Sequence, residues 1–324
     1  MAEHIAALES ELRRVCNPLP GSHPRDNHRP VNIRHAHNGW FLLDALVDRF
    51  PQISPAVWEA RCNAGRFVDQ PGAVCGKDHR VRAGEQLVQV FPLEIEPPVA
   101  TDIRVLYADD ALMAVVKPAP LPMHPSGRFH RNTLQHIINL ACTPHVVRPV
   151  HRLDANTTGI VLLARTREAC RHLQQQFLAG SVVKRYLVRV TGHPANDTFF
   201  CAAPISNQPC VLGTHSIDEL TGRTARTDFQ VDERCADGTS LLEAVLGTGR
   251  TNQIRLHLWH LGHPVAGDPA YLAGGLLGDT QTLAPTAPPL QLHAWQLTCR
   301  HPTSGELLHF GTARPDWARV YVDN

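Results

Sequence analysis

Residues 149–164 place one carboxylate between two apolar segments, and no other stretch constrains the fold as tightly. The flanking segments have the composition of β-strands, and Asp154 stands where the first gives way to a polar turn. Thr157 and Thr158 carry short hydroxyl side chains that bond nearby backbone groups, and Gly159 can adopt a positive φ. The stretch predicts a β-hairpin with an aspartate at its turn. Because aspartate also caps many structural turns, the rest of the sequence must decide whether Asp154 is reactive.

The length and charge of the chain narrow its functions. Its 324 residues suffice for one large domain and a small one, and its formal net charge of +1 gives no general attraction to a polyanion. Any nucleic-acid-binding surface must then be local. The 9 cysteines include no Cys-x-x-Cys pair, which speaks against a disulfide framework and a structural zinc site. Without a signal-peptide pattern or a membrane-spanning apolar run, we expect a soluble cytoplasmic protein that contacts no membrane.

Apolar patterning divides the chain into three expected parts. Residues 1–38 form an N-terminal extension, a short helix followed by a Pro- and His-rich stretch too poor in apolar residues to build a core. Residues 39–92 form a small module of two helices and short strands. After a proline-rich linker, residues 100–324 form a larger domain of mixed α and β structure, which carries a Gly- and Pro-rich insertion at 273–289.

Several common kinds of site find no support. No Gly-x-Gly-x-x-Gly follows a strand and no Walker-type loop occurs, so nothing indicates a nucleotide cofactor. His257, His260 and His263 resemble a metal cluster, but steps of three residues drift around a helix and Gly262 ends it, which disfavours zinc. Ser126 lacks the strand–turn–helix setting of a hydrolase nucleophile, while a Cys–His nucleophile stays open.

Six segments follow one another in the order of a known family. They are residues 117–125, 151–159, 184–186, 223–227, 249–268 and 292–295. The second, His-Arg-Leu-Asp-Ala-Asn-Thr-Thr-Gly, resembles the H-R-L-D-x-x-T-S-G motif of the RluA-type pseudouridine synthases. The third and fifth resemble the K-x-Y and G-R-T-H-Q-I-R-x-H-L motifs of that family. Although each motif is weak alone, their shared order makes the resemblance specific.

The resemblance implies that uridine in ribosomal or transfer RNA is isomerised to pseudouridine, without a cofactor or a metal. Asp154 would be the catalytic carboxylate, and Arg255 would keep it ionised and oriented through a bidentate pair. Tyr186 would stack on the uracil, and its hydroxyl could take the proton from carbon 5. Since the target base must leave its stack to reach them, other residues would hold the extruded nucleotide: His151, Arg152, Thr158, Lys184, Arg250, Gln253 and Leu256.

The family also sets the expected fold and partners. The fold would be α+β, with a mixed, largely antiparallel central sheet flanked by helices and a small α/β RNA-binding module before it. RNA would be the partner of a monomeric enzyme. The module at residues 39–92 weakly resembles an αL-type RNA-binding domain, in which Arg61, Arg66 and Arg82 would contact RNA. The alternative is a packing domain, since a basic helix face is often solvated surface.

Three departures from the family pattern concern the placement of the substrate rather than the catalytic set. Thr158 replaces the usual serine but keeps the hydroxyl. Asn252 stands where the family generally has histidine, and residues 312–315 replace the common A-P-L-P ending.

Two other functions compete with uridine isomerisation. A catalytically silent RNA-binding protein could keep the fold, but the intact Asp154, Tyr186 and Arg255 speak against it. A hydrolase of the glycosidase type would need a second carboxylate at a suitable separation, and the sequence shows no obvious one. Singly, the three residues could be a turn cap, a sheet-face aromatic and a helix-surface cation, but this leaves their shared spacing unexplained.

Overall fold

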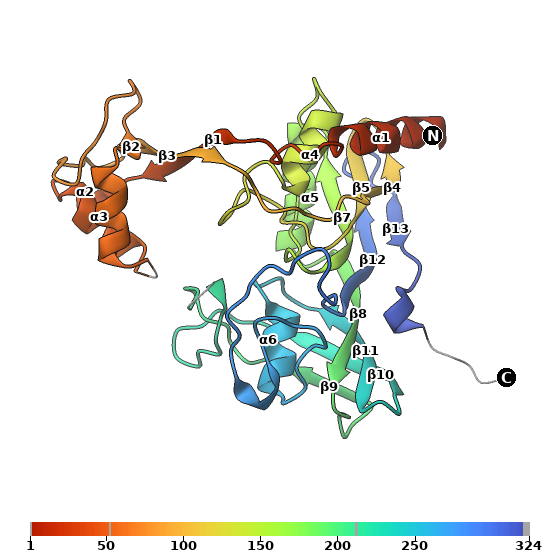
Figure 1. The fold of residues 1–324 in the computed structure, drawn as a ribbon. Coiled ribbons are helices and arrows are strands. Elements are labelled where there is room, and N and C mark those ends of the chain that lie inside the picture. Colours follow the sequence, from red (N-terminus) through yellow and green to blue (C-terminus); the bar gives the residue numbers. More distant parts are fainter. Residues whose placement is uncertain (1, 52, 211–212, 320–324) are drawn as a thin grey trace. The chain divides into compact units, whose positions relative to one another are not determined.

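The computed structural model describes residues 2–51, 53–210 and 213–319 (Figure 1). They form two compact units: the smaller is Gly21–Glu96, and the larger combines the residues up to Pro20 with those from Pro97 onward. These limits differ from the expected division at residue 38 and at 92–100. The difference arises because the first 38 residues are shared between the two units.

In the smaller unit, two strands pair antiparallel with a third and two helices pack against them. The elements are β1 (Arg25–Asn32), η1 (His35–His37), α2 (Leu42–Arg49), α3 (Pro55–Asn63), β2 (Phe67–Val68) and β3 (Gln86–Glu94). Val31 on β1 and Ile33 just after it are buried among the side chains of α2 and α3. The expectation that this polar stretch adds nothing to a core was therefore wrong. On β1 only Asn27 and Val31 are buried, so its composition hides the strand.

Helix α1 (Ala2–Val15) belongs to the larger unit. Its Leu12 is buried in the main core, and the Glu9 Oε1 accepts a hydrogen bond from the Val105 N–H at 2.9 Å. Val105 lies on β4 (Arg104–Ala108), the first strand in the sheet order, so the helix satisfies a backbone donor at that end of the sheet. The smaller unit is thus inserted between α1 and β4.

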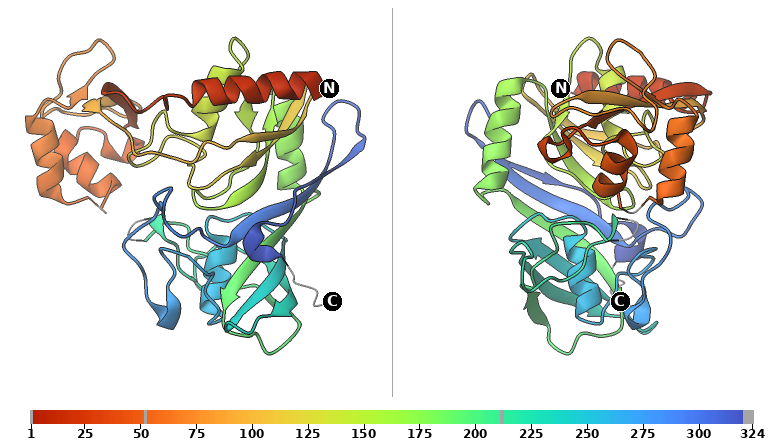
Figure 2. Two further views of the ribbon diagram at one scale, coloured as in Figure 1. Left: turned by 45° about the vertical axis from the view of Figure 1, so that its right-hand side comes forward. Right: turned by 90° about the vertical axis from the view of Figure 1, so that its left-hand side faces the viewer.

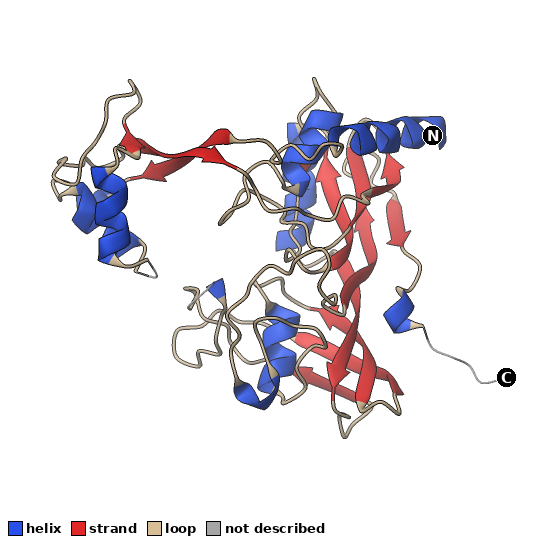
Figure 3. Cartoon of the chain, in the orientation of Figure 1, coloured by secondary structure: helices blue, strands red, loops and turns tan. Residues whose placement is uncertain are grey.

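Ten of the strands that the structure describes form one sheet in the larger unit (Figure 3). Its order is β4-β5-β7-β12-β8-β11-β10-β9, with β13 on β12 and β6 on β7. Only the pairing of β7 with β12 is parallel. The predicted α+β class with a mixed, largely antiparallel sheet is therefore confirmed. The strands after β4 are β5 (Leu112–Lys117), β6 (Arg148–Pro149), β7 (Thr158–Ala164), β8 (Val183–Thr191), β9 (Thr198–Cys201), β10 (Thr227–Arg234), β11 (Thr239–Leu246), β12 (Leu292–Arg300) and β13 (Leu307–Gly311).

Helices cover both faces of this sheet (Figure 2). α1, α4 (Leu134–Ala141) and α6 (Gln253–His260) share one core with the strands, and α5 (Arg167–Leu178) packs in the core of the opposite face. Threonine side chains cap the N-termini of two of these helices. The Thr133 and Thr166 hydroxyls accept N–H groups of the first turns of α4 and α5. Two short 3-10 turns, η3 (Ala273–Gly275) and η4 (Asp316–Ala318), complete the elements.

The predicted hairpin around Asp154 has only one full strand. β6 is two residues long and pairs with the far end of β7, so residues 150–157 form a loop instead of a strand. Beyond the Val150 N–H, which donates to the Leu162 carbonyl at 3.1 Å, the ladder ends, and the Leu162 N–H donates to His151 Nε2 at 2.9 Å instead of to a backbone carbonyl.

Gly159 allows β7 and β12 to meet. Its φ is +115°, and a Cβ added there would lie 2.3 Å from the Ala294 carbonyl oxygen on β12. Only glycine permits both the conformation and this approach of the two strands.

Within the described part of the chain, no helix is long and apolar enough to cross a membrane.

We expect Gly159→Ala to destabilise the fold by about 2–5 kcal/mol, the sum of overpacking and backbone strain. Gly238→Ala is the matched control, because Gly238 also has a positive φ but no atom near its would-be Cβ. Urea unfolding of both variants measures the difference. Equal losses would show that the contact with β12 is unimportant.

His293 on β12 gives the fold a pH dependence. Its Nδ1 hydrogen-bonds with the Thr158 hydroxyl at 2.7 Å, its Nε2 hydrogen-bonds with the Thr312 hydroxyl at 2.6 Å, and burial lowers its pKa from 6.5 to about 4. Between pH 6.5 and 4 the unfolded chain binds the extra proton, so the free energy of unfolding falls as the pH falls. We expect the fall to be smaller in His293→Gln, measured by urea unfolding at each pH. Parallel curves for the two proteins would contradict this.

Candidate active site

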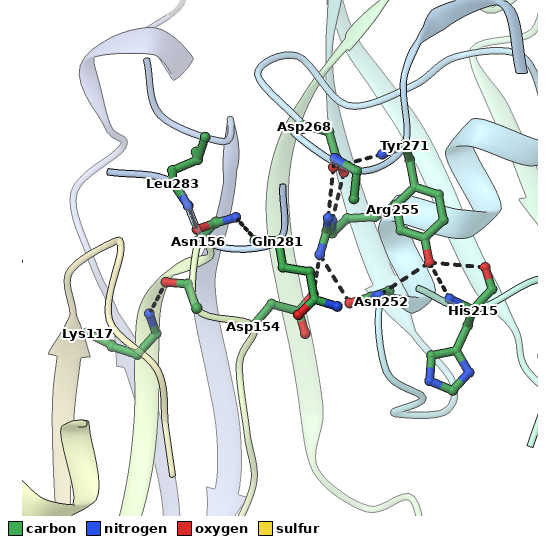
Figure 4. A network of polar contacts seen from close by, with 12 residues as sticks. Lys117, Asp154, Asn156, His215, Asn252, Arg255, Asp268, Tyr271, Gln281 and Leu283 are labelled. Atoms are coloured by element: carbon green, nitrogen blue, oxygen red, sulfur yellow. Dashed lines mark hydrogen bonds and ion pairs between the residues drawn. The ribbon is translucent and has the colours of Figure 1, made fainter. Parts of the chain in front are cut away.

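Asp154 lies on the 150–157 loop, whose backbone is held on both sides of it. The Thr157 N–H donates to the Asp154 carbonyl oxygen at 3.1 Å. The buried Lys117 Nζ donates at 3.0 Å to the carbonyl oxygen of the next residue, Ala155. The Asp154 side chain remains 20% exposed and faces Arg255 (Figure 4). The loop therefore presents a fixed, partly solvated carboxylate.

Arg255 on α6 contacts two carboxylates. Its Nη1 donates to Asp154 Oδ2 at 3.1 Å, and its Nε and Nη2 donate to the two oxygens of Asp268 at 2.7 Å each. Asp268 is completely buried and Arg255 is 6% exposed. Burial lowers the pKa of Arg255, but the hydrogen bond and charge of Asp268, together with Asp154, outweigh this and raise it. The guanidinium thus stays charged.

The expected pair of Asp154 and Arg255 exists, but the bidentate geometry belongs to Asp268. The guanidinium fork faces Asp268, because this carboxylate is fixed by the N–H groups of Ala270 and Tyr271 at 2.8 and 3.1 Å. Of the three N–H groups that remain, one on Nη1 donates to Asp154. Sequence reasoning missed the role of Asp268, although the Gly267-Asp268 turn was the signal that could have revealed it.

A second set of bonds orients Arg255 from the other side. Asn252, just before α6, accepts from Arg255 Nη1 at 3.1 Å and donates to the Tyr271 hydroxyl at 3.2 Å. That hydroxyl also accepts from the His215 N–H at 2.8 Å and donates to the His215 carbonyl at 3.1 Å. The Arg255 guanidinium lies 5.2 Å from the centre of the Tyr271 ring. The catalytic candidate Arg255 is therefore fixed by Asn252, which the sequence marked only as a departure from the family pattern, and by Tyr271, whose role the sequence did not indicate.

A cavity of about 530 Å³ opens beside Asp154. Tyr186 on β8 lines it together with the apolar Ile254 and Leu292. Tyr186 is only 6% exposed, and burial together with the negative charge of Asp154 raises its pKa, so its hydroxyl stays protonated. The structure thus brings Asp154, Tyr186 and Arg255 to one cavity whose size suits a planar base and its sugar.

Cationic side chains surround the same cavity. Arg152, Lys184 and Arg250 line it as the sequence predicted, and Arg223 joins them. Arg152 and Arg223 are exposed, whereas burial lowers the pKa of Lys184. Arg250 is fixed by donation from its Nε to the Thr224 carbonyl at 3.0 Å. Positive charge thus gathers locally in a chain that is almost neutral.

The remaining predicted residues have mainly structural contacts. His151 lines the cavity, but its ring holds the Leu162 N–H, and burial lowers its pKa to about 3. Gln253 also lines it and uses its side-chain amide to hold Thr248, Arg250, Arg226 and Thr227. Thr158 and Leu256 line neither this cavity nor the second cavity described below. Thr158 hydrogen-bonds with His293, and Leu256 is fully buried in a small apolar cluster with Ile205, Ala225, Ala270 and Tyr271.

A second cavity of about 260 Å³ lies on the other side of Asp154. Asp154, Asn252 and Arg255 line both cavities and so stand between them. Residues 122–126 line the second cavity, together with Gln281 and Thr282 of the 273–289 insertion. The insertion therefore contributes directly to the site.

In the smaller unit, two of the three predicted RNA-binding arginines are partly buried. The Arg61 guanidinium lies 4.9 Å from the Trp58 ring centre and 5.7 Å from that of Phe91. Arg66 is half-buried and Arg82 is exposed. Arg29 lies 4.2 Å from the same Phe91 ring, and sequence reasoning missed this neighbour.

Among residues 2–51, 53–210 and 213–319, no group of three His, Cys, Asp or Glu side chains is placed to hold a metal ion. The candidate His257 uses both ring nitrogens, one with the Thr227 hydroxyl at 2.9 Å and one with the Ala203 carbonyl at 3.0 Å. The structure thus gives His257 two local hydrogen-bond partners.

Comparison with known proteins agrees with this geometry. Residues 111–260 match a family model described as RNA pseudouridylate synthase. The chain is 35% identical over 310 residues to ribosomal large subunit pseudouridine synthase D of Nitrosomonas europaea, covering 91% of this chain and 87% of the relative. It is 34% identical over 218 residues to dual-specificity RNA pseudouridine synthase RluA of Salmonella typhi, covering 66% of this chain and 94% of the relative.

A comparison of structures points to the same family. The structure of human RNA pseudouridylate synthase domain containing 1 superimposes with a TM-score of 0.53 at 25% identity and covers 67% of this chain and 86% of that one. Both sequence relatives are more than 30% identical over most of their length. The chain therefore belongs to the RNA pseudouridylate synthase family, among its RluA-type members.

Proposed function

We propose that the protein isomerises selected uridines of ribosomal or transfer RNA inside the larger cavity, with Asp154 as the catalytic carboxylate. The observation that carries this proposal is the Asp154–Arg255 contact of 3.1 Å at the wall of a cavity that Tyr186 also lines. The names of the relatives supply the substrate class, since one is named for the large ribosomal subunit and another is a mitochondrial tRNA pseudouridine(32) synthase.

The reaction needs no outside oxidant or reductant. The bond between the ribose carbon 1′ and uracil N1 breaks, the base rotates, and carbon 1′ bonds to carbon 5. The proton on carbon 5 leaves, and N1 gains a proton. Attack on the sugar and removal of a ribose proton both require an ionised Asp154. Arg255 donates to one oxygen of Asp154 and so orients it, while Asp154 Oδ1 makes no hydrogen bond with the described residues.

Tyr186 has the position and chemistry of a stacking platform. Its ring lies at the wall of the cavity, where an extruded uracil can pack against it. Because burial and Asp154 raise its pKa, forming a tyrosinate is costly, and this favours stacking over a role as the base at carbon 5. Sequence reasoning had left both roles to this residue.

The cations around the cavity suit the RNA backbone. Arg152, Lys184, Arg223 and Arg250 surround the opening, where phosphates of the extruded nucleotide and its neighbours would lie. Such contacts offset the few kcal/mol that unstacking the target base costs. In the smaller unit, Arg61, Arg66 and Arg82 are assigned to further RNA contacts, with Arg29 beside Phe91 as an additional candidate.

One experiment tests the catalytic assignment. Total RNA from a strain lacking the gene, labelled with tritium at carbon 5 of uridine, should release tritium when incubated with the wild-type protein. Asp154→Asn should reduce release to background, because the amide can neither attack the sugar nor remove a proton. Equal release by both proteins, or none by the wild type, would overturn the proposal.

Asp268→Asn should lower the rate of tritium release by about 100-fold, because a misplaced Arg255 no longer aims Asp154. It should also destabilise the fold by about 3–5 kcal/mol, since a buried cation loses its main partner. The control is Asp232→Asn, which removes the partner of Arg314 at 3.0 Å, since neither residue lines either cavity. Release rates and urea unfolding are measured for both variants, and a loss of the same size in the control would contradict this role.

A further inference from the structure

The 273–289 insertion contacts both the turn that holds Arg255 and the loop that carries Asp154, and these two residues are the proposed catalytic pair. It follows the turn that carries Asp268, and it is held there because the Gly278 N–H donates to the Ala270 carbonyl at 2.9 Å. A Cβ added at Gly278 would lie 2.0 Å from the Pro269 carbonyl oxygen, so the two backbones are in close contact. One end of the insertion is therefore fixed to the turn that holds Arg255.

The same insertion reaches the loop of Asp154 through Asn156 (Figure 4). This side chain is 2% exposed. Its Nδ2 donates to the Gln281 carbonyl at 2.7 Å, and its Oδ1 accepts the Leu283 N–H at 3.0 Å. Two bonds of opposite sense from one planar amide fix both its position and its orientation.

The contacts close a ring around the site. Starting from Arg255, it passes through Asp268, along the insertion to Asn156, through the loop to Asp154, and back to Arg255. Asn156 is the one side chain that joins the insertion to the loop by hydrogen bonds within the described residues. A ring of this kind restrains the distance between the carboxylate and the guanidinium more than either contact alone.

We propose that Asn156 is a positioning residue, which transmits the placement of the 273–289 insertion to Asp154 and so sets the catalytic pair. This inference rests on the proposed function. A residue in this role acts on the chemical step and leaves RNA binding to the cations of the cavity. A residue that only supports the fold would instead change stability and all activities together.

The test compares Asn156→Ala and Asn156→Asp with the matched control Asn139→Ala. Asn139 Oδ1 accepts the Val147 N–H at 2.8 Å but lines neither cavity. With the tritiated RNA described above, we expect Asn156→Ala to lower kcat by about 100-fold with little change in KM, as for a small misplacement of a catalytic group. Asn156→Asp keeps the acceptor for the Leu283 N–H but sets a carboxylate oxygen against the Gln281 carbonyl, so we expect its kcat to fall as well. Asn139→Ala should match the wild type.

A variant on the insertion side removes the ambiguity of changing a residue near Asp154. Gly278→Ala should push the insertion away from Pro269 and lower kcat in the same direction, although residue 278 lines neither cavity. RNA binding by filter retention and the melting temperature are recorded for every variant.

Wild-type kcat in soluble, RNA-binding Asn156→Ala would overturn the positioning role. So would a KM effect alone, or a loss in Asn139→Ala as large as that in Asn156→Ala. Should Asn156→Ala fail to fold, a wild-type kcat in both Asn156→Asp and Gly278→Ala would overturn it as well. Failure of the proposed function is distinguishable, because the wild-type protein itself would then release no tritium.

Discussion

The buried fork between Arg255 and Asp268 is the interaction on which the site depends. A guanidinium that is 6% exposed is costly to bury without a charged partner, and the fully buried side chain of Asp268 accepts two hydrogen bonds of 2.7 Å from it. The turn of residues 267–271 must therefore pack against α6. Once it does, Asn252 and Tyr271 complete the shell. Because Asn252 accepts from one N–H of Arg255 Nη1, the other N–H of Nη1 is directed at Asp154.

Sharing one arginine between two carboxylates explains why Asp154 can be reactive. A bidentate pair would occupy both oxygens of Asp154 and bury them, whereas the single contact uses Oδ2 and leaves the side chain 20% exposed. The side chains of Asp154, Asp268 and Arg255, when all three are ionised, together carry one net negative charge. The cations around the cavity face this charge and also suit the phosphates of RNA, so one electrostatic arrangement serves both the enzyme and its polyanionic substrate.

Sequence patterns revealed what is local and missed what depends on tertiary contacts. The apolar segment after the Asp154 turn correctly predicted β7, and the order of the family motifs indicated that Asp154, Tyr186 and Arg255 share one site. The sequence did not predict β1, because only Asn27 and Val31 on it are buried. The strand expected before Asp154 is a loop, in which His151 Nε2 accepts the Leu162 N–H. The Gly267-Asp268 turn marked that aspartate without showing which arginine it would pair with, so the roles of Asp268 and Asn156 became visible only in three dimensions.

The departure at Asn252 illustrates how a family position can change without loss of its role. Asn252 has φ +56°, a left-handed conformation that asparagine and histidine both adopt more readily than most residues. Its amide accepts from Arg255 and donates to Tyr271, and a neutral imidazole likewise offers one acceptor and one donor. The two residues can thus satisfy the same pair of neighbours. What the position requires is a side chain that bridges an arginine and a tyrosine at the start of α6, and asparagine meets that requirement without a group that titrates near neutral pH.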